Sequence, residues 1–247
     1  AGWREFIDSH AIRFALGGGP SKKALRKLIE LLDDPEGLVI RAVRETLTVL
    51  ELGPEFSEEL AELVGSPDNE VGLWAIERLG TLAGGSKLAT RTLLPVAASA
   101  NRARAEAATR VLAALPNGEA LLVDALEGAT EEVGAHVLAG ALNPNAARLK
   151  PKDLKRLRAA GAAQLGKAFA VAKRQLEPVR LADPQGWAGV LRDRAKALAK
   201  KDPPRAEAIS ELLGRSMAAT PADRYAIATQ GLQRHSLDPH PRARQRD

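Results

Sequence analysis

The sequence has 247 residues, of which 45% are hydrophobic, 27% are charged and 3% are aromatic. This composition is typical of a globular chain with one large domain or two small ones, and it excludes a disordered or fibrous chain. Because the sequence contains no cysteine, it has no disulfide framework, thiol nucleophile, iron–sulfur cluster or thiolate zinc site. Alanine and leucine together supply 82 residues, which favours helices.

Charge divides the chain near Pro151. Residues 1–150 carry 16 Lys or Arg and 21 Asp or Glu, whereas residues 151–247 carry 20 and 10. The two parts therefore present different electrostatic fields to a partner. We expect a repeat region with an N-terminal capping helix over 1–150, a basic helical region over 151–236, and a Pro/Arg-rich tail or linker over 237–247.

The chain has no initiator Met and no signal-peptide pattern, so we expect it to be a trimmed piece of a longer parent chain. No apolar run reaches the roughly 18–20 residues of a membrane-spanning helix. We therefore expect a soluble chain with no membrane insertion.

The first predicted element is a helix over residues 3–16. Trp3, Phe6, Ile7, His10 and Phe14 lie within about one third of a helical wheel. This stripe predicts a capping helix that buries its apolar face against the first repeat. The alternative is a docking helix for a domain outside the sequence.

A repeating pattern follows. Leu28, Val39 and Leu47 have counterparts 32 residues later at Leu60, Val71 and Leu79. Each unit combines a helix, a short Pro-containing break and a second helix with an apolar residue every four positions. The predicted positions that continue this pattern in the third and fourth units are Val96, Ala103, Ala107 and Val111, then Leu126, Val133, Val137 and Ala141.

The units built on residues 34–47 and 66–80 resemble HEAT and HEAT-like repeats, the family that includes the phycobilin-lyase type. The resemblance covers about residues 21–142. It implies a right-handed α-solenoid of HEAT-like helical hairpins. Together with the helical periodicity that persists beyond Pro151, this predicts an all-α fold that ends in an irregular helical C-terminal region. The resemblance also implies a concave, protein-binding surface lined by the second helix of each unit.

Glycine-rich breaks at 17–22 and 84–87 punctuate the repeats. We interpret both as glycine helix stops followed by a serine N-cap. A phosphate-binding loop is the alternative, but neither stretch fits the G-x-x-x-x-G-K-[ST] pattern or follows a predicted strand.

Beyond Pro151, helical periodicity predicts helices near 152–177, 187–200, 204–218 and 222–235. On the first of these, apolar residues lie on one side and basic residues lie nearly opposite. The alternative is a break at Gly161 or Gly166, which would end this division of the faces there. This basic stripe supplies the candidate anion-binding residues Lys152, Lys155, Arg156, Lys167, Lys173 and Arg174. The stripe fits a phosphate backbone, an acidic protein, an anionic membrane surface or simply a solvated helix face.

No catalytic constellation is visible. The adjacent acids Asp33-Asp34, Glu58-Glu59 and Glu131-Glu132 lie at predicted corners or first turns, where they favour the helix dipole or face water. His235, Asp238 and His240 in the Pro/Arg-rich end make a poor preorganised metal site. We predict no catalytic residue, no metal and no cofactor.

These observations predict a noncatalytic scaffold that binds a partner protein, or another domain of a longer parent chain, through the repeat surface. The candidate partner-binding residues on the second helices are Arg41, Arg44, Glu45, Trp74, Arg78, Arg104 and His136. The alternative is a sequence-nonspecific nucleic-acid-binding module that uses the basic C-terminal helices. A third hypothesis, an enzyme resembling helical-repeat DNA glycosylases, predicts a pocket with a buried carboxylate beside Trp74.

Overall fold

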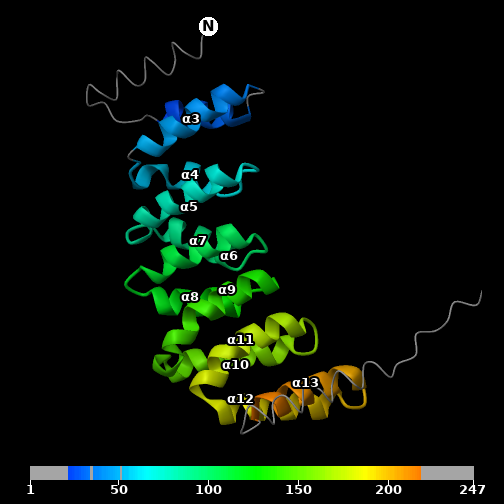
Figure 1. Ribbon diagram of the computed structural model, residues 1–247. Coiled ribbons are helices and arrows are strands. Elements are labelled where there is room, and N and C mark those ends of the chain that lie inside the picture. The colour runs from blue at the N-terminus through cyan, green and yellow to red at the C-terminus, as the bar shows by residue number, and fades with distance from the viewer. Residues whose placement is uncertain (1–21, 34–35, 51, 218–247) are drawn as a thin grey trace, which may run out of the picture. The chain divides into compact units, whose positions relative to one another are not determined.

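The computed structural model describes residues 22–33, 36–50 and 52–217. Within these ranges every regular element is a helix (Figure 1). The chain divides between Pro144 and Asn145 into two compact units, here called unit 1 and unit 2. The predicted capping helix, the predicted helix 222–235 and the tail lie outside the described residues.

Unit 1 consists of helix pairs. The first helices are α2 (Lys22–Glu30), α4 (Ser57–Leu63), α6 (Lys87–Ala97) and α8 (Gly118–Glu127), and the second helices are α3 (Gly37–Val49), α5 (Asn69–Ala83), α7 (Arg102–Ala113) and α9 (Glu132–Leu142). Short 3₁₀ turns follow α2 at Leu31–Asp33, precede α4 at Pro54–Phe56 and follow α9 at Asn143–Arg148. Helix α4 contacts α6 and α6 contacts α8, while α7 contacts both α5 and α9, so successive pairs pack side by side (Figure 1).

Side-chain caps explain where several of these helices begin. The Asp68 carboxylate accepts hydrogen bonds from the backbone N–H groups of Glu70 and Val71 at the start of α5. Ser86 caps α6 by accepting from the N–H of Ala89, directly after Gly84 has ended α5. The interpretation of residues 84–87 as a glycine stop with a serine N-cap is therefore confirmed.

The predicted register is correct for the first two units and wrong for the next two. Ala75 and Leu79 are fully buried, and their buried counterparts are Ala108 and Leu112 in α7, then Leu138 and Leu142 in α9. The predicted core positions Ala103 and Val133 are exposed, and Val96, Val111, Val137 and Ala141 are half-buried. Ala107 and Leu126 are buried as predicted.

The spacing between buried leucines explains this shift. The buried Leu93 of α6 lies 14 positions after Leu79, whereas Leu60 lies 13 positions after Leu47. The extra residue lies between Leu79 and Leu93, and it rotates every later position by about 100° on its helix. A fixed offset of 32 therefore selects the wrong face of α7.

Thiol labelling distinguishes the two registers because the chain has no cysteine of its own. In an Ala103→Cys variant the thiol lies on the surface, and we expect it to react with a maleimide at the rate of a free thiol. In an Ala108→Cys variant the thiol takes a position that is 0% exposed, and we expect it to react about 100-fold more slowly because labelling requires local opening. Equal rates would contradict the observed register.

Unit 2 contains α10 (Pro151–Gln164), α11 (Phe169–Ala182), α12 (Pro184–Leu198) and α13 (Pro203–Met217). The single helix predicted over 152–177 is wrong, because the chain turns between Gln164 and Phe169 and forms two helices. The helices predicted near 187–200 and 204–218 correspond to α12 and α13. The core of unit 2 includes Leu157, Leu165, Leu176, Val179, Trp187, Leu191 and Ile209.

Two close approaches hold α10 and α11 in an antiparallel pair. A Cβ on Gly161 would lie 2.5 Å from the Leu176 side chain, so the absence of a side chain on Gly161 lets α11 pack directly against α10. Arg158 of α10 pairs with Asp183 at the end of α11. Asp183 also caps α12 by accepting from the N–H of Gly186, 2.9 Å away.

Candidate functional site

The second helices of unit 1 expose side chains at equivalent positions. The buried positions align the second helices with one another. In this alignment residues 38, 70, 103 and 133 are equivalent. Residues 41, 106 and 136 are also equivalent, as are residues 45, 77 and 110. All ten of these side chains are exposed. We call this set the second-helix face, and its members are Leu38, Arg41, Glu45, Glu70, Glu77, Ala103, Glu106, Arg110, Val133 and His136.

Charge and apolar surface are mixed on this face. Its members include four glutamates and two arginines, so its formal charge is negative. Leu38 is 72% exposed, whereas Val133 is 37% exposed and is therefore mostly covered by its neighbours. Single exposed apolar side chains are common on protein surfaces, so the charge of the face says more about a partner than these two residues do.

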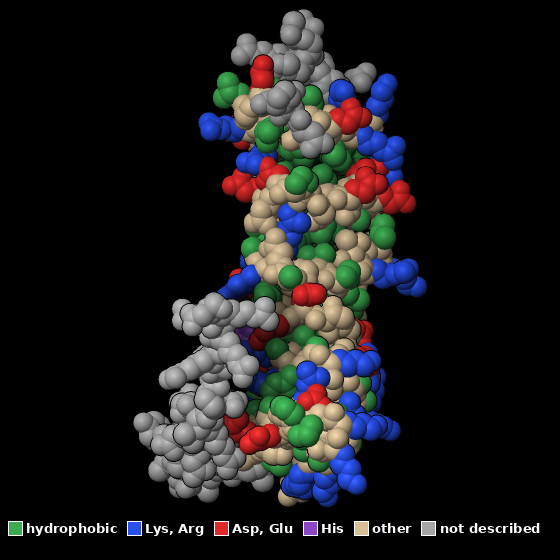
Figure 2. Space-filling model, turned by 90° about the vertical axis from the view of Figure 1, so that its right-hand side faces the viewer, with side chains coloured by type: hydrophobic (Ala, Val, Ile, Leu, Met, Phe, Trp, Pro, Cys, Tyr) green, Lys and Arg blue, Asp and Glu red, His purple; other side chains and the backbone are tan. Residues whose placement is uncertain are grey.

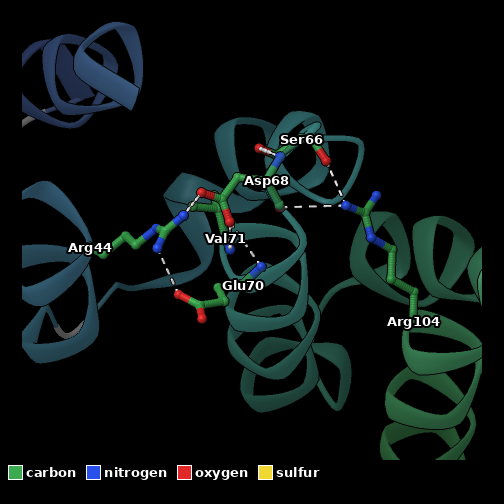
Figure 3. A network of polar contacts seen from close by, with 6 residues as sticks. All are labelled: Arg44, Ser66, Asp68, Glu70, Val71 and Arg104. Atoms are coloured by element: carbon green, nitrogen blue, oxygen red, sulfur yellow. Dashed lines mark hydrogen bonds and ion pairs between the residues drawn. The ribbon is translucent and has the colours of Figure 1, made fainter. Parts of the chain in front are cut away.

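A polar network joins the second helices through the loop before α5 (Figure 3). Arg44 reaches this loop from α3, where its guanidinium pairs with the Asp68 carboxylate and with Glu70 Oε2, 2.8 Å away. Asp68 therefore caps α5 and holds Arg44 at the same time. Arg44 therefore links α3 to the beginning of α5.

Arg104 reaches the same loop from α7 (Figure 3). Its guanidinium donates to the carbonyl oxygens of Val64 at 2.9 Å, Ser66 at 2.5 Å and Asp68 at 3.5 Å. A Cβ on Gly72 would lie 2.9 Å from this guanidinium, so Gly72 leaves the space that the arginine occupies. Arg104 takes a position equivalent to the buried Val39 and Val71, and its contacts hold two repeats together.

A small hollow of about 90 Å³ lies beside this network. Its lining includes Arg44, Glu70 and Trp74, together with Leu47 and Val71. The indole Nε1 of Trp74 is buried and has no hydrogen-bond partner among the described residues. The carboxylate that lines the hollow belongs to Glu70, whose side chain is 75% exposed and paired with Arg44. The buried carboxylate that the glycosylase-like hypothesis predicts beside Trp74 does not line this hollow.

The predicted partner-binding residues occupy different environments. Arg41, Glu45 and His136 belong to the second-helix face. Trp74 and Arg78 are half-buried in α5. Arg44 and Arg104 direct their guanidinium groups into the loop before α5, so the geometry gives both a structural role.

The candidate anion-binding residues lie in three places. Because α10 and α11 are antiparallel, Lys152 near the start of α10 and Lys173 near the start of α11 lie at opposite ends of the helix pair. Lys155 and Arg156 lie in α10, Lys167 lies in the turn, and Arg174 follows Lys173 in α11. The single basic stripe predicted for a continuous helix is therefore wrong.

Glu59 lies in a different environment from the one predicted for the adjacent acids. Glu58 is exposed in the first turn of α4, as predicted, but the neighbouring Glu59 side chain is only 2% exposed. Its Oε1 lies 3.2 Å from Arg26 Nη2 and 3.7 Å from Lys22 Nζ, both on α2. The sequence feature that indicates this ion pairing is a pair of cations one helical turn apart, Arg26 and Lys22, which precede Glu59 by 33 and 37 residues.

No three His, Cys, Asp or Glu side chains in the described ranges are placed so that they could hold a metal ion. Among the helices of these ranges, none is both long and apolar enough to cross a membrane. Comparisons with protein-family models, curated proteins and solved structures found no match to this chain.

Proposed function

We propose that the chain is a noncatalytic interaction scaffold, in which unit 1 is a right-handed HEAT-like α-solenoid that binds a partner protein, or another domain of a longer parent chain, through the second-helix face. The observation that carries this proposal is the succession of exposed, equivalent positions along α3, α5, α7 and α9. Because each helix pair packs on its neighbours, the face extends over several repeats, as a binding surface of a repeat protein does.

The charge of the face indicates the chemistry of the partner. Glu45, Glu77 and Glu106 are exposed members of the face, and residues 1–144 carry 14 Lys or Arg against 21 Asp or Glu. A partner with a basic surface complements this field, and charge complementarity accelerates association and excludes wrong partners. Leu38 and Val133 supply apolar contacts near the ends of the face.

Charge reversal at Glu77 tests the proposal. In quantitative affinity capture from extracts of the source cell, we expect Glu77→Lys to lower the recovery of a specific partner about tenfold relative to the unmodified chain, because it places a like charge opposite the partner's basic surface. The matched control is Glu119→Lys, which makes the same change at an exposed position of α8, a first helix. We expect the control to retain full recovery.

The outcomes separate the proposal from a general charge effect. Loss of capture with Glu77→Lys alone supports the second-helix face as the binding surface. Equal loss with both variants would show that capture follows net charge, and equal retention would place the binding surface elsewhere. Either of these two results would contradict the proposal.

A further inference from the structure

Unit 2 contains a pocket of about 310 Å³ that is lined by α11, α12 and α13. This volume is at the lower end of the range for small-molecule sites, roughly 300–1,000 Å³. Unit 2 is also strongly basic, since residues 145–217 carry 17 Lys or Arg and 7 Asp or Glu. Lys and Arg side chains are numerous in the lower part of the space-filling view, where unit 2 is drawn (Figure 2).

The pocket lining concentrates this positive charge. Lys173, Arg174 and Arg180 line it from α11, and Arg215 lines it from α13. Glu177 is the one acidic side chain among the described lining residues. Because residues 173, 177 and 180 are separated by four and three positions, they project from the same side of α11.

Two of the four cations are already neutralised. Arg174 Nη1 lies 3.4 Å from Glu177 Oε2, and Arg215 pairs with Glu211 one turn earlier in α13. Lys173 and Arg180 form no ion pair or hydrogen bond with any other described residue. The pocket therefore retains two positive charges without a partner in the described part of the chain.

We propose that this pocket binds a small phosphomonoester through Lys173 and Arg180. A phosphomonoester carries a charge of about −1.5 to −2 at neutral pH, which matches the two cations that have no partner among the described residues. A guanidinium group binds phosphate oxygens in a bidentate manner, and an ammonium group adds a compact point charge. Leu212 provides an apolar part of the lining for the organic part of the ligand.

The shape of the site favours a small ligand over a nucleic acid. A duplex is bound by cations distributed along its phosphate backbone, whereas these four cations surround one pocket. Proteins that bind single-stranded nucleic acids combine a basic groove with aromatic side chains on which the bases stack. Trp187, the aromatic residue in the described lining, is 3% exposed and offers no free ring face.

Isothermal titration calorimetry with phenyl phosphate, at low ionic strength and pH 7.5, tests the proposal. We expect saturable binding of one phenyl phosphate per chain, competed by inorganic phosphate. Lys173→Gln and Arg180→Gln should each weaken the affinity about tenfold, because each removes one charge-assisted contact. Absence of saturable binding at millimolar phenyl phosphate would overturn the proposal.

Matched variants distinguish the pocket from the general charge of unit 2. Lys196→Gln and Arg192→Gln make the same two changes at exposed positions of α12 that do not line the pocket. We expect both to bind phenyl phosphate with unchanged affinity. Equal weakening in the control variants would overturn the proposal, as would a DNA duplex that binds more tightly than phenyl phosphate and loses affinity with the pocket variants. Circular dichroism of each variant confirms that the helices are retained.

Discussion

Replacing Gly134 with alanine is expected to lower the free energy of unfolding by about 2–3 kcal/mol. A Cβ at this position would lie 2.2 Å from the carbonyl carbon of Ala98, 2.4 Å from its oxygen and 2.6 Å from its Cα. These are backbone atoms at the end of α6, so they cannot rotate away as a flexible side chain would. Helix α9 must therefore move away from α6, which disturbs the packing between two repeats.

Gly140 provides the control in the same helix. It is exposed, and a Cβ there would meet no atom within 4 Å. Since alanine is a better helix former than glycine, Gly140→Ala should raise the free energy of unfolding by up to about 1 kcal/mol. Urea denaturation followed by circular dichroism measures both variants, and a Gly134→Ala variant as stable as the unmodified chain would contradict the close contact between α6 and α9.

Truncation of Arg104 to alanine is expected to lower the free energy of unfolding by about 2–4 kcal/mol. The change removes a guanidinium that donates to the carbonyl oxygens of Val64, Ser66 and Asp68. Those carbonyls lose a charged donor, and the connection between α7 and the loop before α5 is lost. Arg104→Lys should recover part of the loss, because one ammonium group lacks the planar fork that reaches several carbonyls.

Arg102 in α7 is the matched control for Arg104. Its side chain is 73% exposed and pairs with Glu106 at 2.8 Å, four residues along the helix. Exposed pairs of this kind contribute about 0.3–0.5 kcal/mol, so Arg102→Ala should change the urea midpoint little. If the two alanine variants were equally stable, the structural role assigned to Arg104 would be wrong.

The helical character of the chain could be predicted because it rests on local signals. The recurrence of apolar residues every three to four positions indicates helices throughout unit 1, and Gly84 and Ser86 mark a helix end and a helix start. A fixed period could not predict the core positions of α7, because one added residue between Leu79 and Leu93 turns Ala103 to the surface and Ala108 into the core.

The contacts of Arg104 and of Glu59 depend on tertiary packing, which no local sequence pattern encodes. Arg104 looks like an ordinary helix-surface residue in the sequence, yet it occupies a core-equivalent position because Gly72 leaves space for its guanidinium. Glu59 looks like a first-turn acid, yet α2 covers it with Lys22 and Arg26. Likewise, the pocket of unit 2 could not be predicted, because it forms only when α11, α12 and α13 pack together.

Site-specific photo-crosslinking in the source cell tests the proposed second-helix face most directly. A photoreactive amino acid at position 77 in α5 lies on this face, and one at position 119 in α8 lies on an exposed part of a first helix. The scaffold account predicts a discrete crosslinked protein from position 77 and none from position 119. A partner crosslinked from position 119 and not from position 77, or no crosslink from either, would contradict it.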